Sequence, residues 1–351
     1  MNKILSFLLL VVTLSVANSA LAQGPIGKRA KKASDRSKSK PLTRYTHPLR
    51  FPKHMKYISV GGGIGASNYF GDLAPKLNRL SSDIRMTRSY IAGVVTRRYS
   101  PYVSYRVSLG WARLRGDDFS ADPERSIEDR GRYLRGLSFR NDVKELSLTM
   151  IGDLLPTEKG YLRRNFLNGY GFIGLAVLTN NPRAQAPDDC PGCEGSAGKW
   201  VALAPLQTEG KKYSTIQIGI PMGIGARYRL KDKLDLSFEV GYRWLFTDYL
   251  DDVSTEFVKD PLTLKNDLAR VMYNRSGEKE SSTGKSRDIE KWASVDGYGM
   301  TTNPITGRDQ VIGYENGSSP RGNPKGKDYY IVTAVHLTYI LDSRTRAPKF
   351  R

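Results

Sequence analysis

The clearest pattern in the chain is an apolar–polar alternation over residues 234–247. Its apolar positions are Leu234, Leu236, Phe238, Val240, Tyr242, Trp244 and Phe246. Because successive side chains of a β-strand point to opposite faces, this segment has one apolar and one mostly polar face. In a soluble sheet the apolar face would turn inward, whereas in an outer-membrane barrel it would meet lipid.

Comparable segments predict about eight strands. Their ranges are 57–69, 89–99, 102–114, 142–154, 166–179, 214–228, 234–247 and 329–341. The connections after the second and sixth strands are short and the one after the fourth is moderate, whereas the other connections are long. Short turns at one end and long loops at the other are typical of bacterial outer-membrane barrels. The sequence therefore predicts an all-β fold: an antiparallel transmembrane barrel over residues 57–341, with a long loop at 249–328.

The N-terminus predicts export. Residues 1–22 have the features of a secretory signal peptide: Lys3, an apolar stretch at 4–16 and small residues at Ala20 and Ala22. The apolar stretch is shorter than the roughly 20 residues that a membrane-spanning helix needs. An exported barrel with an even strand number has both termini in the periplasm, so we expect the long loops outside the cell.

Aromatic residues fit the two head-group levels of such a barrel. Trp111, Trp244 and Tyr329 lie near the outer ends of the predicted strands, and Tyr105, Tyr228 and Tyr339 lie near the periplasmic ends.

A barrel of about eight strands has an interior just wide enough for side chains. Charged residues expected to face inward are Arg106, Glu145, Arg227, Glu239 and Arg243. Buried charges must be paired, so we expect Arg–Glu pairs that plug the lumen.

Two basic segments lie outside the predicted barrel. The chain has 351 residues, 39% of them hydrophobic, and 55 Lys and Arg against 35 Asp and Glu, a net charge of +20. Residues 23–56 form a basic arm that we expect to be poorly ordered, and residues 342–351 form a basic tail. An exported protein does not meet nucleic acid, so nucleic acid is excluded as the partner. We therefore expect the excess of positive charge to face anionic lipid or an envelope partner. The arm is either a solvated tether or a docking segment.

The chain offers little candidate chemistry. Cys190 and Cys193 form one CxxC, which favours a disulfide in an oxidising envelope over a zinc site. The predicted outer strand ends carry acidic residues, namely Asp72, Asp117, Asp118, Asp248, Asp251 and Asp252. We interpret them as hydrogen-bonded rim carboxylates and not as a calcium loop. The histidines are His47, His54 and His336, and no GxSxG, HExxH or P-loop motif occurs. We expect no catalytic, cofactor or metal site.

Four segments resemble one family. They are 67–75 (SNYFGDLAP), 116–118 (GDD), 135–148 (RGLSFRNDVKELSL) and 244–254 (WLFTDYLDDVS). They are similar to the PorG-like outer-membrane barrels of the type IX secretion system in Bacteroidetes-type bacteria. The resemblance implies an outer-membrane component associated with a periplasmic ring of secretion and gliding proteins, without catalytic residues. We further expect the segments to pack into one assembly at the outer rim, with Arg140 near the carboxylates.

The functional hypothesis is a non-enzymatic outer-membrane anchor that binds partners of a type IX secretion and gliding apparatus. One alternative is a small-solute channel. Another, less favoured, is an outer-membrane lipid-modifying enzyme with a dispersed Ser/His site.

Overall fold

The computed structural model describes residues 56–74, 86–157, 160–280, 284, 286–314 and 320–341. All of them belong to one compact unit, His47–Arg351. The expected signal peptide, residues 23–55 of the basic arm, which include His47 and His54, and the basic tail lie outside the described residues.

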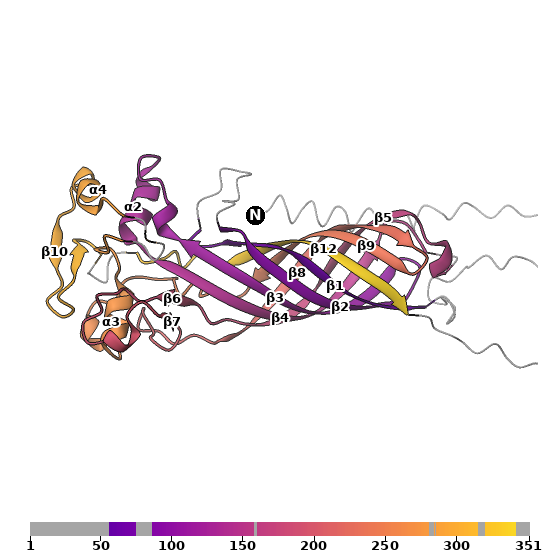
Figure 1. Cartoon of the computed structure of the whole chain (residues 1–351), viewed down its shortest axis with the longest axis horizontal. Helices are drawn as coiled ribbons and strands as arrows, with labels where there is room; N and C mark the ends of the chain where they lie inside the picture. The colour runs from indigo at the N-terminus through magenta and orange to yellow at the C-terminus, as the bar shows by residue number, and fades with distance from the viewer. Residues whose placement is uncertain are drawn as a thin grey trace, which may run out of the picture. The chain divides into compact units, whose positions relative to one another are not determined.

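Eight long antiparallel strands form a closed barrel (Figure 1). They are β1 (Ile58–Phe70), β2 (Arg88–Arg98), β3 (Val103–Asp117), β4 (Ser138–Asp153), β5 (Leu167–Thr179), β8 (Ile216–Lys231), β9 (Leu234–Leu245) and β12 (Tyr329–Leu341). The order around the barrel is β3-β2-β1-β12-β9-β8-β5-β4, and the pairing of β3 with β4 closes it. The predicted fold class, an antiparallel barrel of about eight strands, is confirmed.

Apolar side chains cover the outside of this barrel. Every long strand exposes at least one large apolar residue, for example Ile64, Ile91, Leu109, Leu146, Leu175, Ile224, Phe238 and Leu337. Their chain neighbours point inward and are often polar: Phe238 is 50% exposed, whereas Glu239 is 5% exposed. This arrangement is the inverse of a soluble sheet, and a continuous apolar belt of this kind is suited to lipid.

Two strands continue beyond the ranges that apolar alternation predicts. β3 reaches Asp117 and β4 begins at Ser138, and the two remain paired over this extension. The outward positions there carry Arg115 and Arg140 and no longer apolar residues. Because strand pairing is made by the backbone, the ladder continues where the apolar pattern has stopped.

The long connections contain short elements. They are η3 (Asp118–Ser120), α2 (Ile127–Arg135), β6 (Arg183–Gln185), η5 (Glu194–Ser196), β7 (Trp200–Ala202), η6 (Pro261–Thr263), α3 (Asp267–Tyr273), α4 (Ile289–Val295), β10 (Met300–Thr302) and β11 (Asp309–Val311). The moderate connection contains η4 (Tyr161–Arg163). Within the described residues, no helix has the length and apolar character needed to cross a membrane.

Local capping explains where α2 lies. The Ser126 side chain accepts a hydrogen bond from the Asp129 backbone N–H, which caps the first turn. The helix ends at Gly136, whose φ of +66° is a left-handed conformation that favours glycine. This helix therefore delivers Arg132 and Arg135, in its last turn, toward the acidic residues described below.

Candidate functional site

Ion pairs cross the lumen of the barrel. Arg106 on β3 bonds to Glu239 on β9, which lies four strands away around the barrel. Arg243 on β9 lies 3.5 Å (Nε to Oε2) from Glu145 on β4. All four side chains are at most 9% exposed. The structure thus brings together four of the five residues that we expected in the lumen as two Arg–Glu pairs.

Two tyrosine hydroxyl groups and a histidine also contact the carboxylates of the two glutamates. The Tyr170 hydroxyl donates a hydrogen bond of 2.6 Å to Glu239, and the Tyr330 hydroxyl donates to Glu145. His336 lies in the lumen with Nε2 3.7 Å from Glu239. A buried carboxylate is stable only when its oxygens accept several hydrogen bonds or face cations. These tyrosines are therefore part of the network, and the charge pattern alone does not identify them.

The fifth expected residue, Arg227, pairs with an aspartate. Its Nη1 lies 3.2 Å from Asp153 Oδ1, and Arg98 contacts the same carboxylate. Beside them, Arg164 Nη2 lies 2.7 Å from Asp235 Oδ1. This second layer lies at the end of the barrel where the short turns are. The expected lumen residues did not include Arg98, Asp153, Arg164 or Asp235. Alternation does place Asp153 inward with Glu145 on β4 and Asp235 inward with Glu239 on β9, whereas Arg164 lies outside the strands and no alternation applies to it.

Side chains fill the space between these layers. The cavity there has a volume of about 30 Å³ and is lined by Arg106, Arg227, Glu239 and His336, among others. That volume has room for no more than a few water molecules. The lumen therefore contains an ion-pair network in place of an open pore.

A second polar network joins the long loops. Asp118 is fully buried and accepts hydrogen bonds from Arg135 Nε and Nη2 at 2.7 and 2.9 Å and from the Leu137 N–H at 3.1 Å. Arg135 Nη2 also donates to the Asp72 carbonyl at 2.8 Å, and Nη1 donates to the Arg321 carbonyl. Arg135 thereby connects the loops after β1, β3 and β9.

Asp251 and Asp328 share a tyrosine. The Tyr69 hydroxyl oxygen lies 2.6 Å from Asp251 and 3.0 Å from Asp328. Burial raises the pKa of Asp251 well above its usual range, and the negative charges of Asp328 and Asp72 add to the effect. Burial likewise raises the pKa of Asp328. Protonation of one of these carboxyls relieves the repulsion between them.

The remaining acidic residues of the rim also accept hydrogen bonds. Asp252 accepts from Tyr213 at 2.6 Å and lies 3.6 Å from Arg321, while burial raises its pKa to about 6. Burial also raises the pKa of Asp248 to about 6, and its carboxylate accepts from Ser254 at 2.7 Å. Asp72 accepts from the Asn323 N–H at 2.8 Å, and Asp117 caps η3. In the described residues, no group of three His, Cys, Asp or Glu side chains is arranged to hold a metal ion.

The position expected for Arg140 is wrong. Arg140 points outward from β4, where its guanidinium lies 4.1 Å from the centroid of the Trp200 ring and its Nε lies 3.9 Å from Asp142. Arg135 takes the expected role beside the rim carboxylates. The physical reason is strand parity: inward and outward positions alternate along β4, and Arg140 shares the outward face with Asp142 and Leu146.

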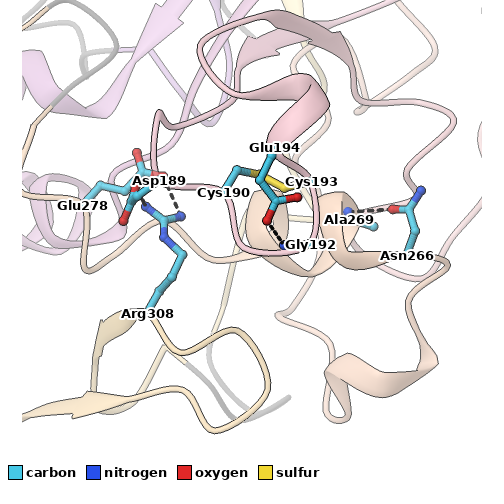
Figure 2. Close-up of a disulfide and its surroundings, with 9 residues drawn as sticks. All are labelled: Asp189, Cys190, Gly192, Cys193, Glu194, Asn266, Ala269, Glu278 and Arg308. Carbon is cyan, nitrogen blue, oxygen red and sulfur yellow. Dashed lines mark hydrogen bonds and ion pairs between the residues drawn. A yellow bond between two sulfur atoms is a disulfide. The ribbon is translucent and has the colours of Figure 1, made fainter.

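The disulfide joins Cys190 and Cys193 within the connection after β5 (Figure 2). Next to it, Arg308 Nη2 lies 3.2 Å from Asp189, and Arg308 Nη1 lies 3.3 Å from Glu278 (Figure 2). Gly192 has a φ of +74°, and its N–H donates to Glu194 at 2.9 Å. The loop closed by the disulfide is therefore tied through Arg308 to the connection between β9 and β12.

Comparisons with known proteins return outer-membrane barrels. A family model described as a domain of unknown function (DUF6089) matches residues 51–179, which is less than half of the chain. No curated protein matches the sequence. Among solved structures, the chain is similar to a major outer membrane protein from Thermus thermophilus, with 12% identity and a TM-score of 0.33. That alignment covers 82% of this chain and 100% of the other.

Two proteins of Pseudomonas aeruginosa are also similar. They are the outer membrane protein OprG (9% identity, TM-score 0.32) and the N-terminal β-barrel domain of OprF (8% identity, TM-score 0.30). The alignments cover 81% and 80% of this chain and 95% and 97% of those chains. None of these descriptions names a PorG-like protein or a secretion system. The fold assignment rests on strand pairing and on the apolar outer surface: the chain forms a small eight-stranded β-barrel of the outer-membrane type.

Proposed function

We propose that this protein is a non-enzymatic outer-membrane anchor that binds partners of a protein-secretion and gliding apparatus of the type IX class. The observation that carries the proposal is the filled lumen. A cavity of about 30 Å³ between buried ion pairs leaves no room for a solute or a substrate. The surfaces at the two ends of the barrel are then left to perform the function.

The proposal assigns the short-turn end to the periplasm. Ile58 at the start of β1 pairs with Leu341 at the end of β12, so the two ends of the barrel sequence lie together. The turn between β8 and β9 lies at the same end, because Leu234 pairs with both Tyr339 and Lys231. Outer-membrane barrels have short periplasmic turns and long extracellular loops. Both termini would therefore enter the periplasm.

The periplasmic partner surface would be basic. Arg97, Arg163 and Lys231 are exposed at the short-turn end, and the arm and tail add further positive charge. Such a surface favours an acidic partner, since complementary charge accelerates association and disfavours wrong partners. The resemblance to PorG-like proteins supports a periplasmic ring of secretion proteins as that partner.

A deletion strain tests the proposal. We expect secretion of type IX substrates to fail in the deletion strain and to recover with the wild-type gene. Tagged wild-type protein, captured from gently solubilised envelopes, should bring down ring proteins. A variant with Arg97→Gln, Arg163→Gln and Lys231→Gln should capture fewer.

The matched control removes the same charge from the loops, by Arg125→Gln, Lys259→Gln and Lys291→Gln, all at exposed positions. It should capture ring proteins as the wild type does. Normal secretion in the deletion strain, together with capture of no ring protein, would reject the secretion role.

A further inference from the structure

Three arginines form a row on the outer wall of the barrel, across β3, β4 and β6. Arg115 faces Arg140 in the β3–β4 pair, and Arg140 faces Arg183 in the β4–β6 pair. Residues directly opposed in an antiparallel pair lie on the same face with Cβ atoms about 4.5–5.5 Å apart. Like charges in this position are destabilising. The pairing of these strands therefore concentrates positive charge at a cost to the free protein.

Nearby carboxylates compensate the charge of this row only in part. Arg113 and Arg115 lie near enough to Arg88 to repel it, and Arg113 and Arg183 repel Arg140. Among the described residues, Asp142 lies 2.7 Å from Arg113 and 3.9 Å from Arg140, and Asp117 lies 3.3 Å from Arg115. Within the described residues, Arg183 has no ion-pair partner, and the buried Nε of Arg140 has no hydrogen-bond partner.

The row lies just beyond the apolar belt. Leu109, Trp111, Arg113 and Arg115 are successive outward positions of β3, and Leu109 is 66% exposed. At roughly 3.4 Å per residue and a strand tilt of about 40°, Arg113 and Arg115 lie about 5 and 10 Å above Trp111 along the barrel axis. Tryptophan favours the head-group level. Arg113 is thus at about the height of lipid phosphates, and the long side chain of Arg115 can extend down toward them.

We propose that Arg115, Arg140 and Arg183 bind the phosphate groups of an anionic lipid in the leaflet at the long-loop end of the barrel. Guanidinium groups bind phosphate oxygens through paired, charge-assisted hydrogen bonds. The exposed apolar residues below, Leu109 and Leu146, would contact the acyl chains of the same lipid. The proposal depends on the membrane-spanning barrel and not on the secretion role.

Fluorescence quenching by brominated lipids tests this site. The chain has four tryptophans, and two of them report on the row: Trp111 lies under Arg113 and Trp200 under Arg140. A full-length background with Trp244→Phe and Trp292→Phe limits the signal to these two. It would be reconstituted in phosphatidylcholine vesicles that contain either brominated phosphatidic acid or brominated phosphatidylcholine.

We expect the phosphatidic acid to be preferred at least about tenfold, because each arginine near an anionic lipid surface contributes about a fivefold preference. The triple variant Arg115→Gln, Arg140→Gln and Arg183→Gln should reduce the preference to about twofold or less. The single variant Arg183→Gln should reduce it partly. The loop control Arg125→Gln, Lys259→Gln and Lys291→Gln should retain it.

Heat-modifiable migration on gels would verify that each variant is folded. The row is on the surface, and removal of mutually repelling charges should not disrupt the barrel. Equal quenching by the two brominated lipids, or a preference that survives in the folded triple variant, would overturn the proposal. A result of this kind would leave the secretion role untouched, since that role is tested by deletion and capture.

Discussion

Arg106 and Glu239 are 133 residues apart in the sequence and form an ion pair across the lumen of the barrel. Both side chains are buried, and Glu239 also accepts a hydrogen bond from Tyr170. The pair connects β3 to β9 on opposite sides of the barrel. It joins the walls and occupies the space through which a solute would have to pass.

Loss of Glu239 should destabilise the barrel. Glu239→Leu leaves Arg106 buried without its carboxylate, and we expect the free energy of unfolding to fall by roughly 3–5 kcal/mol. The double variant Arg106→Met with Glu239→Leu should recover much of this loss, because no buried charge is then left unpaired. Urea unfolding in detergent micelles, followed by tryptophan fluorescence, measures both. Equal destabilisation by the single and double variants would contradict the ion-pair explanation.

The purified protein should not form a large channel. The buried pairs Arg106–Glu239 and Arg243–Glu145 and a cavity of about 30 Å³ leave no continuous path for solutes. Planar-bilayer recordings should show no steady, large conductance. A reproducible conductance of porin size from folded protein would favour the small-solute channel instead.

Arg135 and Arg140 form a matched pair for testing the loop assembly. Arg135→Gln leaves the fully buried Asp118 without its principal cation, so we expect the loops to be destabilised by roughly 3–5 kcal/mol. Arg140→Gln removes an outward, partly exposed arginine, and its effect should be within about 1 kcal/mol. Hydrogen exchange of loop segments 118–137 and 248–256 measures both variants. Similar protection in the two variants would argue against Arg135 as the connecting residue.

The loop assembly should be more stable at pH 5 than at pH 8. Burial raises the pKa of Asp248 and of Asp252 to about 6, above the value near 4 of an unfolded chain. The folded state then binds more protons than the unfolded state between these values, so stability falls as the pH rises through about 6.

The pKa of Asp252 lies about two units above the unfolded value, which corresponds to about 2.7 kcal/mol in full. About half of this, roughly 1.4 kcal/mol, is lost between pH 5 and pH 8, because the remainder is already lost as the pH rises to about 5. Hydrogen exchange or limited proteolysis of the loops at pH 5 and pH 8 measures this change, with exchange corrected for its intrinsic pH dependence. Asp252→Asn should make the dependence shallower, whereas Asp122→Asn, at an exposed position, should leave it unchanged. Greater loop stability at pH 8 than at pH 5 would contradict the raised pKa values of Asp248 and Asp252.

The site could be predicted from the sequence only in part. The apolar–polar alternation predicts that Arg106, Glu145, Glu239 and Arg243 face the lumen. The positions of the aspartates at strand ends predict that they lie at the rim. Alternation does not reveal Arg321, which lies outside the strands and yet contacts both Glu209 and Asp252. Strand parity excludes Arg140 once β4 is known to begin at Ser138, but it does not point to Arg135, which a capped helix positions.

The sequence by itself indicated about eight antiparallel strands and, within their regularly alternating parts, the face that most side chains occupy. A strand in a membrane barrel places apolar side chains outward at alternate positions. This requirement is local, so it can be recognised in the residue order. Only the tertiary structure decided which charges meet. Arg227 pairs with Asp153 and not with a glutamate, and Arg115 faces Arg140 and then Arg183. Such partners depend on barrel closure, strand stagger and loop paths, which bring together residues that no local pattern relates.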